Sequence, residues 1–86
     1  MSDEDLRKTV LKVLTEVAPD IDPDTVEPET NFRDQFDFDS MDFLNFAIGL
    51  HKATGVDIPE TDYPRLSNLN SSISYLQEGK RLQQPE

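Results

Sequence analysis

The sequence predicts an all-α fold, a small bundle of three amphipathic helices plus one short helical turn. Apolar residues recur at helical spacing in three separate stretches, and nowhere do apolar and polar residues alternate as they do in a strand. The chain has 86 residues, which is enough for one small domain. We place that domain at residues 1–79 and predict a flexible C-terminal tail at residues 80–86.

The first predicted helix starts near Ser2 and Asp5, which have the spacing of a capping box. Pro19 ends it, since proline lacks the N–H and disfavours helix in the residue before it. The apolar stripe of this helix consists of Leu6, Val10, Val13, Leu14 and Val17.

Residues 19–39 are predicted to be a loop, because they hold three prolines, eight acidic residues and only one base, Arg33. A loop of this length is unusual in a compact domain unless it is held in place or functional. Burying apolar side chains would hold it, and the candidates are Ile21, Val26, Phe32, Phe36 and Phe38.

A second helix is predicted over residues 40–54, because Asp39 and Ser40 can both cap a first turn and Gly55 is placed to end it. Its apolar stripe is Met41, Leu44, Ala47 and Ile48, widened by Phe43, Phe46 and Leu50. Residues 60–66 contain Pro64 and leave room for one helical turn at most. Asn68 can cap a last helix, with Gly79 past its end and a stripe of Leu69, Ile73 and Leu76.

Composition limits the classes of partner. Eighteen acidic residues against eight basic ones give a formal charge of −10, which repels nucleic acid and anionic lipid and favours basic protein surfaces. No apolar run approaches the roughly 20 residues of a membrane span, so we expect no membrane insertion. The absence of cysteine excludes disulfides, thiolate metal sites and cysteine nucleophiles. We predict a monomer in the cytoplasm.

Ser40 has two interpretations. A serine at this position commonly does no more than cap the helix. Alternatively it carries a phosphoryl-linked group, because an anion there would meet unpaired N–H groups and the positive end of the helix dipole. The residues next to Ser40 do not decide between the two.

We predict no catalytic residue and no metal site. His51 is the only histidine and lies eleven residues from Ser40, about 16 Å along the predicted helix axis, whereas a nucleophile and its base need contact near ~3 Å. The aspartates from residue 20 match the first positions of a calcium loop, but Thr25 replaces its glycine and Asn31 its closing glutamate.

Residues Leu6 to Leu76 resemble an acyl carrier protein. Asp39-Ser40-Met41 is similar to the family's Asp-Ser-Leu, whose serine receives 4'-phosphopantetheine. Further positions match in register, and this favours attachment at Ser40 over a mere cap. They are Thr30-Asn31-Phe32 and Phe36 before the serine, Leu44, Phe46, Ala47, Ile48 and Leu50 after it, then Ile58-Pro59, and finally Leu66, Leu69, Ile73, Tyr75 and Leu76.

The resemblance implies a carrier and not an enzyme. A phosphopantetheinyl transferase would attach 4'-phosphopantetheine from coenzyme A to Ser40, beside Asp39. The thiol of the arm would hold acyl groups as thioesters for acyl-activating or acyl-transferring enzymes with basic docking surfaces, in fatty acid, lipid or polyketide metabolism. The resemblance places partner contacts at Met41, Asp42, Asn45, Ile48 and His51.

The sequence departs from the family's usual pattern near the serine. Asp37 stands where the family commonly has glycine, and Asn45, His51 and Lys52 stand where acids are frequent, so we expect a more selective set of partners. Two alternatives stay open. The load could be an aminoacyl or other specialised group, or the chain could be an unmodified interaction module that only binds a basic partner.

Overall fold

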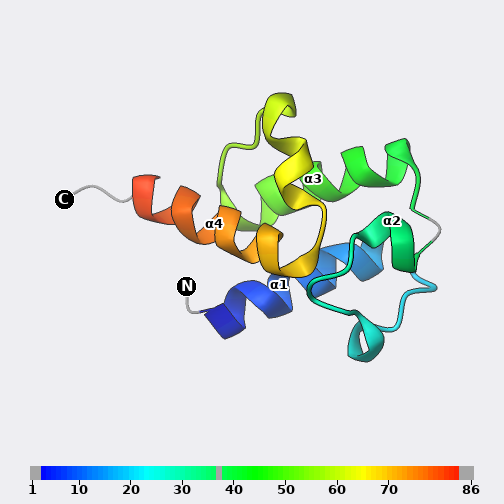
Figure 1. Ribbon diagram of the computed structural model, residues 1–86. Coiled ribbons are helices and arrows are strands. Elements are labelled where there is room, and N and C mark those ends of the chain that lie inside the picture. The colour runs from blue at the N-terminus through cyan, green and yellow to red at the C-terminus, as the bar shows by residue number, and fades with distance from the viewer. Residues whose placement is uncertain (1–2, 37, 84–86) are drawn as a thin grey trace.

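The computed structural model describes residues 3–36 and 38–83, and all regular structure within these ranges is helical (Figure 1). The three long helices have 15 residues each and are α1 (Asp3–Val17), α3 (Ser40–Thr54) and α4 (Leu69–Gln83). Three shorter elements connect them: the 3-10 helix η1 (Pro23–Thr25), the helix α2 (Phe32–Gln35) and the 3-10 helix η2 (Glu60–Leu66). The predicted all-α bundle is confirmed.

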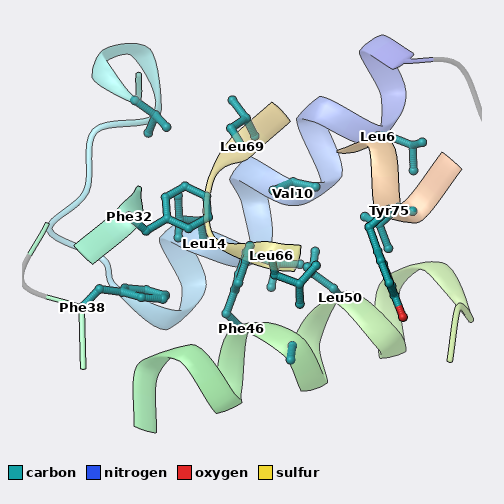
Figure 2. Packing of buried hydrophobic residues seen from close by; sticks show 14 of the residues in the cluster. Leu6, Val10, Leu14, Phe32, Phe38, Phe46, Leu50, Leu66, Leu69 and Tyr75 are labelled. Carbon is teal, nitrogen blue, oxygen red and sulfur yellow. The ribbon is translucent and has the colours of Figure 1, made fainter. Parts of the chain in front are cut away.

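Helix α1 lies at the centre of the packing and contacts both α3 and α4. Its side of the core is the predicted stripe, in which Leu6, Val10 and Leu14 are fully buried (Figure 2). Phe46 and Leu50 of α3 face them. Burying each such side chain stabilises the fold by about 1.5–3 kcal/mol relative to leaving it exposed. The contact between α1 and α3 is therefore a main source of stability in this small domain.

The segment from residue 19 to residue 39 is not free of regular structure, and this part of the prediction is wrong. It contains η1 and α2, each begun by a short side chain that accepts a hydrogen bond from a backbone N–H: Asp22 from Asp24 and Asn31 from Arg33, both at 2.9 Å. Helices of three or four residues have no apolar period, so only such capping residues mark them.

The predicted anchors of this segment are confirmed. Phe32 is fully buried, and its ring lies 5.9 Å from that of Phe38 and 5.4 Å from that of Phe46, centroid to centroid (Figure 2). Ile21 and Val26 are buried as well, while Phe36 is half-buried against the core. The segment is therefore packed across the helices.

The C-terminal half differs from the prediction in two places. Residues 60–66 form seven residues of 3-10 helix, more than the single turn expected, and include Pro64. Helix α4 does not end at Gly79 but continues to Gln83, so residues 80–83 are helical and not a tail. Residues 84–86, the rest of that tail, and Ser2 of the predicted capping box lie outside the described residues.

Gly79 has a packing role within α4. A Cβ atom at this position would lie 2.4 Å from Cγ1 of Val56, which is buried in the segment after α3. Glycine therefore permits a close approach between α4 and this segment.

We expect Gly79→Ala to destabilise the fold by about 1–3 kcal/mol, although alanine favours a helix by about 1 kcal/mol over glycine. Val56 is stiff at χ1 and cannot easily move aside. The double variant with Val56→Ala should recover part of the loss, as measured by urea denaturation of both single variants and the pair. Strictly additive losses would show that the contact with Val56 is not the reason for the glycine.

Candidate functional site

The start of α3 is capped by Asp39 and not by Ser40. Asp39 has an extended backbone, and its carboxylate accepts a hydrogen bond from the N–H of Asp42 at 2.9 Å. The Asp42 carboxylate in turn accepts one from the N–H of Asp39 at 3.4 Å, which completes a capping box. The interpretation of Ser40 as the helix cap is therefore wrong.

Ser40 is the first residue of α3 and is exposed. Its hydroxyl forms no hydrogen bond with any residue that the structure describes, and Asp39 and Asp42 form the capping box without it. Because Ser40 is exposed, its oxygen is open to an external reagent, and derivatising it would break no hydrogen bond to a described residue.

An open cleft of about 780 Å³ lies beside Ser40. Met41, Phe43 and Leu44 contribute an apolar wall from α3, and Arg33 and Tyr63 lie on the walls formed by α2 and η2. The ring of Tyr63 is 6.3 Å from that of Phe43, measured between centroids. The cleft thus combines aromatic and apolar walls with a comparable number of polar side chains, which include the carboxylate of Glu60.

A polar cluster joins η2, one wall of this cleft, to α4. The Tyr75 hydroxyl donates a hydrogen bond to the Asp62 carboxylate at 2.7 Å. The Arg65 guanidinium lies over the Tyr75 ring, 4.8 Å from its centroid, and pairs with Glu78 at 3.1 Å. Burial, together with the bond to Asp62, raises the pKa of Tyr75 to about 12. Sequence spacing gave no sign of this cluster, which joins residues from separate elements.

The predicted apolar stripe of α3 is partly wrong, because several of its residues lie on the outer face of the helix. Met41, Leu44 and Ile48 are 63%, 37% and 41% exposed, whereas Phe46, Ala47 and Leu50 are the buried residues. Apolar side chains lie on more than one face of this helix, so spacing alone could not select the face that meets the core. The exposed apolar side chains instead form a strip that begins next to Ser40.

The predicted partner-binding residues lie in different settings. Met41, Asn45 and Ile48 are exposed and share one face of α3 at i, i+4 and i+7 spacing. Asp42 is half-buried and part of the capping box. His51 lies in the last turn, where its Nδ1 is 2.8 Å from the carbonyl oxygen of Val56. Leu44 also belongs to the exposed strip but was not predicted as a contact.

Ser40 and His51 lie at opposite ends of α3, as the argument against self-contained serine catalysis requires. Within residues 3–36 and 38–83, no three His, Asp or Glu side chains come together as a metal site would need. None of the helices described has both the length and the apolar composition to cross a membrane.

Comparison with known proteins places this site in a family context. The sequence profile of the phosphopantetheine attachment site family matches residues 4–76. The chain is 27% identical over 75 residues to an acyl carrier protein of Rubrobacter xylanophilus, covering 84% of this chain and 93% of that protein. It is 25% identical over 76 residues to an acyl carrier protein of Lactobacillus acidophilus, covering 88% and 94%. A meromycolate extension acyl carrier protein of Mycobacterium leprae is 27% identical over 77 residues, covering 90% and 66%.

The capping geometry predicts that Asp39 and Ser40 contribute very differently to stability. We expect Asp39→Ala to lower the free energy of unfolding by about 0.5–2 kcal/mol, because the N–H of Asp42 loses its acceptor. Asp39→Asn keeps an acceptor and should retain most of the stability. Ser40→Ala should change it by less than about 0.5 kcal/mol. Urea denaturation measures all three, and an equal loss in Ser40→Ala and Asp39→Ala would contradict the assignment of the cap.

The raised pKa of Tyr75 predicts a loss of stability at alkaline pH. Below about pH 10 the tyrosine is protonated in both the folded and the unfolded chain, so its contribution is fully present. Between about pH 10 and about pH 12 the unfolded chain ionises first, and this contribution is lost as the pH rises. Tyr75→Phe should therefore show a smaller fall in Tm over this range than the wild type. Equal falls in the wild type and Tyr75→Phe would contradict the assignment.

Proposed function

Since the chain belongs to the phosphopantetheine attachment site family, we propose that it is an acyl carrier protein whose 4'-phosphopantetheine is attached to Ser40. The observation that carries this proposal is the exposed Ser40 hydroxyl, which has no hydrogen-bond partner among the described residues and lies beside an open cleft. The similarity to acyl carrier proteins over more than four fifths of this chain supports the same role.

The residues around Ser40 fit such a group. The phosphate would be joined to an oxygen at the start of a helix, where the dipole favours negative charge. Asp39 holds the first turn in place through its bond to Asp42, so the hydroxyl is presented by a fixed backbone. When bound, the group supplies a flexible arm whose thiol holds an acyl load as a thioester.

The chain's own residues present and shelter the group, and they perform no catalysis. The Ser40 hydroxyl donates to no side chain among the described residues, and the Asp39 and Asp42 carboxylates are engaged in the capping box. The transferase would therefore take up the hydroxyl proton. The serine oxygen would bond to the phosphorus of the arm as the pyrophosphate bond of coenzyme A breaks and adenosine 3',5'-bisphosphate leaves. Phe43 and Tyr63 line the cleft next to the serine with aromatic surface and could cover an apolar load. The cluster of Tyr75, Asp62 and Arg65 keeps η2 against α4 and thereby fixes that side of the cleft.

The partners in this proposal are a phosphopantetheinyl transferase and enzymes that load or receive acyl groups. They approach Ser40 along the exposed strip of α3, with Met41, Asn45 and Ile48 as contacts. Asp42 and His51 complete the proposed contact set, Asp42 through the helix start and His51 at the far end. The formal charge of −10 favours partners with basic docking surfaces. Monomeric state and cytoplasmic location stay predictions.

A second candidate function is an unmodified interaction module, which the exposed apolar strip of α3 favours because it needs only contact. Such a module would bind its partner equally well after Ser40→Ala. An aminoacyl or other specialised load uses the same attachment at Ser40, so the mass of the group on the purified protein distinguishes it.

The absence of cysteine gives a direct test of attachment at Ser40. The unmodified chain contains no thiol, so incubation with coenzyme A and a broad-specificity phosphopantetheinyl transferase should create one thiol per molecule. We expect a thiol reagent to label the treated wild type and to leave Ser40→Ala unlabelled. Intact mass should show one added arm in the wild type only.

Ser71→Ala serves as the control, since it removes a serine hydroxyl from the start of α4 and leaves Ser40 in place. It should be labelled like the wild type. A correctly folded wild-type chain that acquires no thiol would support the interaction module. Labelling of Ser40→Ala would show that the arm is attached to another residue.

A further inference from the structure

We propose that Arg33 binds an anionic group carried at Ser40. The inference rests on the proposed function, because the anion would arrive on the arm attached to that serine. Arg33 and Ser40 line the same cleft. The anion is either the phosphodiester joined to Ser40 or a carboxylate on the acyl load, since both present paired oxygen atoms that match a guanidinium.

The backbone at Arg33 is firmly positioned. Its N–H donates to the side chain of Asn31 at 2.9 Å, and the neighbouring Phe32 is fully buried with its N–H bonded to the carbonyl oxygen of Ser67 at 2.8 Å. The guanidinium carbon lies 5.8 Å from the centroid of the Phe43 ring, within the range of a cation–π contact. The backbone of this exposed arginine is thus held by a capped turn, and its guanidinium lies against an aromatic ring.

The N–H donors of the Arg33 guanidinium meet no acceptor within residues 3–36 and 38–83, so they are open to a ligand on that side. Among the residues described, no carboxylate or carbonyl accepts a hydrogen bond from it, although it is the only base in a segment with eight acids. Arg65 shows the contrast, because it also lies on an aromatic ring but pairs with Glu78 at 3.1 Å. Stacking on a ring leaves the N–H groups at the edge of the guanidinium plane open to an anion.

The local charge explains why such a residue is needed. An anion at Ser40 stands next to Asp39 and near Asp42, on a chain with a formal charge of −10. These charges repel a phosphodiester or a carboxylate and would drive the arm away from the surface. Arg33 supplies a cation within the cleft and offsets this repulsion. The arm and its load would therefore rest on the α2 side of the cleft.

The experiment uses the modified chain as the wild type, Arg33→Gln, Arg33→Lys and Arg7→Gln. Arg7 is exposed on α1 and does not line this cleft, so its replacement controls for the loss of one positive charge. Intact mass first confirms that each variant carries the arm. The phosphorus NMR shift is then recorded without a load, and the Arg33 side-chain Nε–Hε resonance with butyryl and succinyl loads, which differ at the terminal carboxylate.

We expect one of two results. Either Arg33→Gln shifts the phosphorus resonance relative to the wild type, or the Arg33 Nε–Hε resonance of the wild type moves with the succinyl load and not with the butyryl load. The first result identifies the phosphodiester as the anion and the second the carboxylate of the load. Arg33→Lys keeps the charge but not the planar fork, so its phosphorus shift should lie between those of the wild type and Arg33→Gln.

The proposal is overturned if Arg33→Gln has the same phosphorus shift as Arg7→Gln and the Nε–Hε resonance responds alike to both loads. A wild type that never takes up the arm would overturn the proposed function itself. The initial mass measurement tells this failure apart from the failure of the anion site.

Discussion

The path of the chain toward Ser40 depends most on the burial of Phe32. Its ring contacts Phe38 just before α3 and Phe46 within α3, while its N–H bonds to the carbonyl oxygen of Ser67 just before α4. Phe32 thus ties the acidic segment both to α3 and to the residues that precede α4. Without this anchor a segment with eight acids would repel itself and extend into solvent, and the residues that lead into Ser40 would have no fixed course. The position of the serine is therefore a consequence of aromatic packing at Phe32, eight residues earlier in the chain.

Asp39 and Ser40, neighbours at the start of α3, have separate roles. Asp39 satisfies the helix start, and Ser40 is left with an unused hydroxyl. A helix that relied on the serine for its cap would lose stability whenever that oxygen was derivatised. Because the cap is an aspartate, modification and stability are separated, and the unmodified and modified chains can share one fold. The Asp39 N–H also donates a hydrogen bond to the Asp42 carboxylate. This second bond orders the turn that carries the Ser40 hydroxyl without involving the hydroxyl itself.

The sequence predicts the long helices well because each carries strong local signals. Helix α3 begins after its N-cap Asp39 and ends before its C-cap Gly55, whose φ of 75° suits glycine. A single residue therefore predicted each end of this helix. The short helix α2 was missed because four residues carry no period. The end of α4 was placed too early because Gly79 reflects a contact with Val56, and a tertiary contact cannot be inferred from a glycine alone. Ser40 was predicted as the attachment site from its register with many other positions, whereas the proposal for Arg33 required its position in the cleft.

The distribution of charge suggests how this chain meets other proteins. Eight of the acids lie between residues 19 and 39, while α3 carries Asp42 and Lys52 and presents Met41, Leu44 and Ile48 to solvent. In the proposed function, long-range attraction would come from the acidic segment and draw in basic surfaces, whereas close contact next to Ser40 would be apolar. Attraction of this kind raises the rate of encounter and weakens with salt, but apolar contact governs how long the complex lasts. Selectivity among basic enzymes would therefore depend on the shape of the strip on α3, since many partners can supply positive charge and few can match three apolar side chains beside an attached arm.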